Sequence, residues 1–178
     1  NVEELWEDLW CKSFQYDLDT YLASLGENAP YKTINAIFQS GLYSPYIGER
    51  LQRRLEKIRD ISGPPPCLSV YDTPDNQKLR DAVLNIMDDH DLDAIVYPTW
   101  SNPPRRIGDL ESPDGNNSDF FPPHTGQPAI TVPMGYTGEG LPAGLQIVGK
   151  LFGEPDIIRI ADAYEQATRH RRPPGLFP

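Results

Sequence analysis

The sequence has few of the residues on which several classes of protein depend. Its 178 residues include only two cysteines and three histidines. Cys11 and Cys67 are too few for a disulfide framework and too far apart for a CxxC device, so both are expected to be ordinary thiols. The histidines at 90, 124 and 170 show neither HxH nor HxxxH spacing and have no cysteine partner. We therefore predict no metal site, and nothing in the sequence indicates another cofactor.

Positive charge is also scarce, and long apolar runs are missing. Lysine and arginine number 16 against 26 aspartates and glutamates, which gives a formal net charge of -10. A nucleic acid or an anionic membrane requires clustered cations, so neither is expected as a partner. No stretch approaches the roughly 20 apolar residues of a membrane-spanning helix. The acidic, amphipathic start NVEELWEDLW is unlike a signal peptide. We expect a soluble protein, with the cytoplasm favoured as its location.

The first half of the chain, residues 1–91, is predicted to be mainly helical. Apolar residues recur at steps of three and four, which indicates amphipathic helices over 3–25, 33–38 and 46–61. The connector SGPPPCLSVYDTPD follows, because three successive prolines supply no backbone donors. Thr73 then reads as the N-cap of a further helix, with Pro74 in its first position.

The second half, residues 92–178, is predicted to hold strands and a closing helix. Short apolar, β-favouring runs at 92–98, 129–134 and 145–148 indicate buried strands. Two of these runs lie in the segment HTGQPAITVPMGYTGEGLPAGLQIVG, in which glycine and proline residues recur. An amphipathic pattern over 154–169 indicates the closing helix. Helices that cover a mixed β-sheet place the chain in the α/β class.

A long segment rich in Pro, Gly, Asn and Asp lies between the first two strands. Residues 100–123 exceed an ordinary connection, and their aromatic residues favour an ordered loop that lines a pocket. Residues in and beside this loop are the candidates for a substrate pocket: Thr99, Trp100, Asp119, Phe120, Phe121, His124 and Thr125.

Two of these candidates have plain alternatives. His124 could orient a substrate, or it could be a solvated loop histidine. Asp119 beside Phe120 and Phe121 could position an amide group, or it could be a turn aspartate followed by two core aromatics. The triplet Asn116-Asn117-Ser118 matches the acceptor pattern for N-linked glycosylation, which matters only in a secreted protein.

The order of motifs in the second half resembles the C-terminal portion of the amidase signature family of serine hydrolases. The motifs that carry the resemblance are Tyr97-Pro98-Thr99, Thr125-Gly126, Pro128-Ala129-Ile130, Val132-Pro133, Gly140-Leu141-Pro142, Gly144-Leu145-Gln146-Ile147 and Glu165. A match of this length and order is more specific than any single short motif. The resemblance implies cleavage of a carboxamide C–N bond through an acyl-serine intermediate.

The catalytic part implied by the resemblance is missing from this sequence. Such enzymes use a Ser, cis-Ser, Lys triad and glycine-rich oxyanion-hole amides, yet the chain contains no Gly-Gly-Ser-Ser-Gly type of run. No residue here is therefore assigned a catalytic role. Residues 1–178 are interpreted as the C-terminal fragment of a single amidase domain.

The expected partners are a small-molecule amide and the upstream portion of the same amidase, and a homodimer of the complete enzyme stays open. Two alternatives to the amidase remain. One is a glutamyl-tRNA amidotransferase A-type subunit, and the other is a non-catalytic binding or scaffold protein with the amidase fold.

Overall fold

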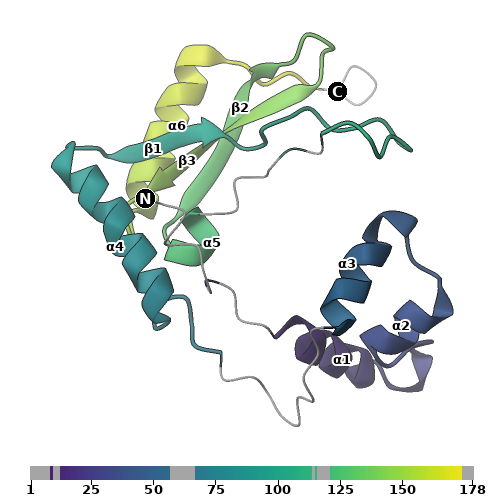
Figure 1. The fold of residues 1–178 in the computed structure, drawn as a ribbon. Coiled ribbons are helices and arrows are strands. Elements are labelled where there is room, and N and C mark those ends of the chain that lie inside the picture. Colours follow the sequence, from purple (N-terminus) through teal and green to yellow (C-terminus); the bar gives the residue numbers. More distant parts are fainter. Residues whose placement is uncertain (1–8, 10–12, 57–66, 114, 116–120, 174–178) are drawn as a thin grey trace. The chain divides into compact units, whose positions relative to one another are not determined.

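The computed structural model describes residues 9, 13–56, 67–113, 115 and 121–173, and the chain divides into two compact units. One unit is Trp10–Leu68. The other combines Asn1–Leu9 with Ser69–Pro178. Figure 1 shows the elements of both units.

The unit Trp10–Leu68 is helical in its described residues. Its elements are the α-helices α1 (Phe14–Ser24), α2 (Ile34–Ser40) and α3 (Pro45–Glu56) and the short 3-10 helix η2 (Gly26–Asn28). Each of the three predicted ranges contains an α-helix, but Leu9 and Ser13, which the first prediction included, are not helical. The parts of those predictions that cover 3–8, 10–12 and 57–61 lie outside the described residues.

Polar caps fix the start of α2. The Thr33 side chain accepts a hydrogen bond from the Ala36 amide at 3.1 Å. Asp19 of α1 accepts one from the Ile34 amide at 2.7 Å, so α1 is tied to the start of the next helix. Gly41 ends α2 in the left-handed conformation at φ 67°, which costs glycine little. These bonds satisfy amide groups that a helix start leaves unpaired.

The prediction that both cysteines are ordinary thiols is wrong for Cys67. This residue is disulfide-bonded. The sequence contains one other cysteine, Cys11, which lies outside the described residues. Whether a cysteine is paired depends on which residues the fold brings close to it, and sequence spacing does not reveal that.

The unit that includes Ser69–Pro178 contains a three-stranded sheet and three helices in its described residues. Its elements are α4 (Pro74–Asp89), β1 (Ala94–Pro98), α5 (Phe121–Thr125), β2 (Ala129–Tyr136), β3 (Pro142–Gly149) and α6 (Glu154–Thr168). The strand order is β1-β3-β2, and both strand pairs are antiparallel. The described strands therefore form an antiparallel sheet where the sequence led us to expect a mixed one. The short connection between β2 and β3 permits only a hairpin.

Each face of this sheet packs against helices (Figure 1). On one face α6 contributes Ile157 and Ala161 to a core with Val132 and Ile147. On the other face a second core joins Leu9 to α4, with residues of β1 and α5 packed against it. Its members are Leu9, Leu79, Val83 and Met87, with Leu84, Ile95 and Phe121 partly buried at its edge. Helices on a sheet confirm the α/β class.

The helix α5 is the α-helix that the sequence did not indicate. Its five residues, FPPHT, include two adjacent prolines near its start. Proline is tolerated in the first turn of a helix because that turn needs no intrahelical amide donor. Of the predicted long loop, residues 100–113 and 115 form neither helix nor strand. No helix among the described residues is long and apolar enough to cross a membrane.

Candidate functional site

The turn that precedes β2 is fixed on α4 by two buried side chains. Asn76 donates from Nδ2 to the His124 carbonyl at 2.9 Å. Arg80 donates from Nη1 to the Thr125 carbonyl at 3.3 Å. Asn76 and Arg80 are four residues apart and therefore share one face of the helix. Because their exposed fractions are only 3% and 9%, these bonds replace water that the buried carbonyls cannot reach.

Thr125 and Gly126 complete this turn. The Thr125 hydroxyl donates to the Phe121 carbonyl at 2.6 Å and accepts from the Gln127 amide at 3.2 Å. Gly126 has φ 73°. A Cβ at this position would come within 2.6 Å of Cε1 in the Tyr71 ring. Only glycine satisfies both demands without strain.

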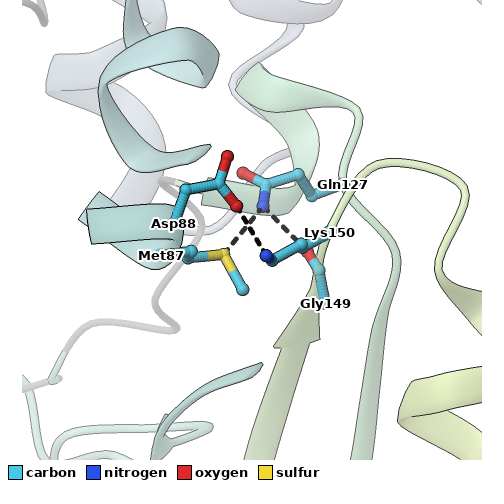
Figure 2. A network of polar contacts seen from close by, with 5 residues as sticks. All are labelled: Met87, Asp88, Gln127, Gly149 and Lys150. Carbon is cyan, nitrogen blue, oxygen red and sulfur yellow. Dashed lines mark hydrogen bonds and ion pairs between the residues drawn. The ribbon is translucent and has the colours of Figure 1, made fainter. Parts of the chain in front are cut away.

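Gln127 connects the same turn to the end of β3 (Figure 2). Its Nε2 donates to the Gly149 carbonyl at 2.8 Å and lies 3.7 Å from Met87 Sδ. Beside it Lys150 forms an ion pair with Asp88 at 2.6 Å. The hydrogen bond that Lys150 donates to the Asp88 carboxylate raises the pKa of Lys150. The turn is thus held between α4 and the sheet at several points.

A row of polar residues crosses the three strands of the sheet. The register aligns Tyr97 of β1 with Gln146 of β3, and Gln146 with Thr131 of β2. Thr99 follows β1 and donates its amide to the Gly144 carbonyl at 2.8 Å. The Thr99 and Thr131 hydroxyl oxygens are 3.2 Å apart. We call Tyr97, Thr99, Thr131 and Gln146 the polar row.

The absence of a side chain at Gly144 allows Thr99 and Thr131 of the polar row to approach each other. A Cβ at this position would come within 2.8 Å of Thr131 Cγ2 and 2.9 Å of Thr99 Oγ1. Any larger residue would therefore push the two threonines apart, which explains the glycine between them. The row combines hydroxyl and amide groups, which both donate and accept hydrogen bonds. Such groups suit an uncharged polar ligand such as a carboxamide.

Within the polar row, the Tyr97 hydroxyl stands out because it lacks a hydrogen-bond partner among the described residues. The phenolic oxygen is buried. Burial raises the pKa of Tyr97 to about 12, because loss of solvent disfavours the phenolate. Its ring lies against Phe121, with the ring centres 6.1 Å apart and the planes tilted by 53°. The Tyr97 side chain is therefore a neutral phenol whose O–H group can donate one hydrogen bond.

The predicted pocket residues occupy three kinds of position. Thr99 belongs to the polar row, and Trp100 follows it with 47% of its surface exposed. Phe121 lies between Tyr97 and the core of α4. His124 and Thr125 are buried, with 3% and 0% exposed, so they support the turn from within. Asp119 and Phe120 lie outside the described residues.

The loop that follows Thr99 is organised around Trp100 and Asp109. A Cβ at Gly115 would come within 2.5 Å of Trp100 Nε1, so the loop returns to the indole. Asp109 accepts hydrogen bonds from the Glu111 and Ser112 amides, both at 3.0 Å. Hydrogen bonds from Ser112 lower the pKa of Asp109. Among the described residues, no group of three His, Cys, Asp or Glu side chains could hold a metal ion.

Sequence reasoning missed the residues that join these parts. Asn76, Arg80 and Gln127 make the buried bonds, and Thr131 and Gln146 complete the polar row. One signal was available for Asn76 and Arg80, because these two polar residues sit one turn apart on the otherwise apolar buried face of the helix. Nothing local identified the others, since their partners are 15 residues or more away.

Comparison with known protein families identifies the family to which this chain belongs. The model of the Amidase family matches residues 68–158, which contain the anchored turn and the polar row. The chain belongs to the amidase signature family, as the motif order led us to expect.

Individual relatives agree with this assignment. The chain is 39% identical over 103 residues to the A subunit of glutamyl-tRNA(Gln) amidotransferase from Oceanobacillus iheyensis, covering 54% of this chain and 21% of that protein. It is 40% identical over 94 residues to the corresponding protein of Methanosarcina acetivorans, covering 48% and 19%. The matched region thus spans about a fifth of these curated relatives.

Solved structures match nearly the whole chain. Native peptide amidase from Stenotrophomonas maltophilia superposes with a TM-score of 0.60 at 26% identity, over 93% of this chain and 34% of that one. A bacterial aryl acylamidase of the amidase signature family shares the fold with a TM-score of 0.57 at 23% identity, over 93% and 34%.

Proposed function

We propose that this chain is part of a serine hydrolase that cleaves a carboxamide C–N bond. The observation that carries the proposal is the family match over 68–158. It coincides with an uncharged polar row, which suits a neutral amide substrate. The name of the matched peptide amidase is consistent with amide cleavage.

The reaction would use residues outside these 178. In the mechanism implied by the resemblance, a neutral lysine accepts a proton from the bridging serine, which in turn deprotonates the nucleophilic serine. That oxygen attacks the amide carbon, and the C–N bond breaks as the amine takes up a proton. Water then hydrolyses the acyl-serine. Backbone amides stabilise the oxyanion in both steps.

The described residues would build one wall of the substrate site. We propose that Thr99, Trp100 and Tyr97 face the substrate, with the Tyr97 phenol donating to a substrate or backbone oxygen. Phe121, His124 and Thr125 would hold this wall in place through the anchored turn. The sequence-based proposal that Asp119 and Phe120 contribute to the same pocket is retained. Residues 1–178 would belong to one amidase domain with the catalytic part.

A second function is supported by the curated relatives. Both relatives described above are named as the A component of glutamyl-tRNA(Gln) amidotransferase, so the complete protein could pass the released ammonia to a partner enzyme instead of to solvent. The polar row is compatible with either outcome, because both begin with cleavage of an amide. A non-catalytic scaffold would lack the triad altogether.

Activity-based labelling separates these possibilities. The complete protein and the 178-residue chain are treated with a fluorophosphonate probe, and ammonia release from a panel of simple amides is measured. We expect labelling and turnover by the complete protein and neither by the chain alone. A complete protein that is neither labelled nor active would refute the hydrolase. Turnover that requires an added tRNA-dependent partner would identify the amidotransferase.

The compartment also belongs to this proposal. The sequence favours the cytoplasm, but the disulfide bond at Cys67 is evidence against it, because cytosolic reductants keep most thiols reduced.

A further inference from the structure

Gln146 lies at the centre of the polar row. It belongs to β3, the middle strand of the described sheet, and the register sets it opposite Tyr97 of β1 and opposite Thr131 of β2. Residues directly opposite each other in antiparallel strands have β-carbons about 4.5–5.5 Å apart. The phenol, the amide and the hydroxyl of these three residues therefore lie side by side across the sheet.

The polar row is on the face of the sheet opposite to α6. Leu145 and Ile147, the neighbours of Gln146 in β3, pack in the core that α6 completes. Because successive side chains of a strand point to opposite faces, Gln146 points to the other face. At one end of the row Tyr97 packs against a ring of α5, and at the other end Thr131 is exposed. The row is therefore accessible from the Thr131 end.

The protein leaves the hydrogen-bonding groups of Gln146 unused. Its side chain is half-buried and forms no hydrogen bond with any described residue. By contrast, the two threonines of the row bond to each other, and buried Gln127 donates to the Gly149 carbonyl. A glutamine amide has two N–H donors and one carbonyl acceptor. The amide of Gln146 is therefore available to a ligand.

A glutamine amide can form two parallel hydrogen bonds with one class of partner. Its nitrogen donates to an acceptor while its oxygen accepts from a neighbouring N–H, as in the pairing of glutamine with adenine. A primary carboxamide presents such a pair, because one of its N–H bonds lies on the same side as its C=O. An ordinary secondary amide is trans, so its N–H points away from the C=O and a substituent occupies that place. An ester has no N–H at all.

We propose that Gln146 binds the scissile group of the substrate through this double hydrogen bond and makes the enzyme selective for primary carboxamides over N-substituted amides and esters. The inference rests on the proposed function, because it names the substrate class of the proposed hydrolase. Gln146 Nε2 donates to the substrate carbonyl, and Oε1 accepts from the nitrogen that leaves. The carbonyl oxygen has two lone pairs, so it also accepts from the oxyanion-hole amides. Water supplies the hydroxyl of the acid and the third hydrogen of the ammonia released.

Substrates that share one acyl group test the selectivity in the complete protein. They are the amide with the highest turnover in the panel, its N-methyl derivative and the methyl ester of the same acid. Gln146→Leu keeps a similar volume but has neither donor nor acceptor. We expect kcat/KM for the primary amide to fall roughly 10- to 100-fold, and the other two values to change by less than about threefold. Rates are expressed per molecule labelled by the fluorophosphonate probe, so misfolded protein does not contribute.

Gln166→Leu is the matched control. Gln166 lies on α6 and donates to Asp162 at 3.5 Å in an exposed pair. The same substitution there should leave all three values unchanged, because α6 packs on the opposite face of the sheet. The wild-type protein should also prefer the primary amide to its N-methyl derivative by about tenfold or more.

The outcomes distinguish this inference from the hydrolase itself. A complete protein that is labelled but shows no preference for the primary amide leaves the hydrolase intact and overturns the pairing. A Gln146→Leu variant whose three values change by the same factor has the same consequence. A complete protein that is neither labelled nor active refutes the hydrolase and the inference with it.

Discussion

Asn76 provides the sharpest test of how the turn before β2 is held. Its side chain is 3% exposed and donates a 2.9 Å hydrogen bond to the buried His124 carbonyl. In Asn76→Ala this carbonyl loses the hydrogen bond from Asn76 Nδ2. Removing one partner of a buried hydrogen bond costs about 1–3 kcal/mol. Because 1.4 kcal/mol corresponds to a factor of ten, local opening of the turn should increase by roughly 5- to 150-fold.

Local opening of the turn can be measured as the rate of amide hydrogen exchange, followed by mass spectrometry on the complete protein. The Gly126 amide donates to the Pro122 carbonyl at 3.0 Å, and the Gln127 amide donates to the Thr125 hydroxyl at 3.2 Å. Both amides should exchange faster in Asn76→Ala. Amides of α6 should exchange as in wild type, because α6 packs on the opposite face of the sheet.

Two further variants make the result interpretable. Lys78→Ala on the same helix removes an ion pair to Asp75 whose side chains are 67% and 41% exposed, and exposed pairs contribute little. It should leave exchange of the turn unchanged. Asn76→Asp keeps the shape of the side chain but loses the donor, and should be at least as damaging as alanine. If both Asn76 variants exchange within twofold of Lys78→Ala, the turn is not held by this bond and the reasoning is refuted.

Other positions give independent tests. Gly126→Ala forces a β-carbon into the Tyr71 ring at φ 73° and should destabilise the turn by about 1–3 kcal/mol. The control Gly138→Ala, whose β-carbon meets open space, should not destabilise it. Equal hydrogen exchange of the turn in the two variants would count against the geometry. Tyr97 has a pKa raised to about 12, above its unfolded value, so its contribution to stability is present below pH 10 and is lost as pH rises toward 12. Ultraviolet titration should show that Tyr97→Phe removes the tyrosine that ionises last; removal of an ordinary tyrosine signal would contradict the burial argument. Trp100→Ala in the complete enzyme should lower kcat/KM about tenfold or more for bulky acyl groups and little for acetamide, and equal losses on both substrates would remove Trp100 from the proposed pocket.

The local elements were largely predictable from their own residues. Thr73 and Pro74 marked the start of α4, and apolar runs marked all three strands, because period and capping depend on neighbours in the chain. The helix α5 was missed, since the adjacent prolines of FPPHT read as loop residues. Thr99 and Trp100, named as pocket candidates from the sequence, stay predictions. Thr99 lies in the polar row with Tyr97, which the motif Tyr97-Pro98-Thr99 contained without a stated role.

The sequence by itself determined the class of the fold, the order of the strands along the chain and the family, because each depends on local pattern or on the order of motifs. Tertiary structure decided which polar groups meet. Thr99 and Thr131 approach to 3.2 Å only through the shared neighbour β3, and Asn76 reaches the His124 carbonyl across 48 positions of sequence. The disulfide at Cys67 has the same origin. Strand register and helix docking set these distances, and no residue's immediate neighbours encode them.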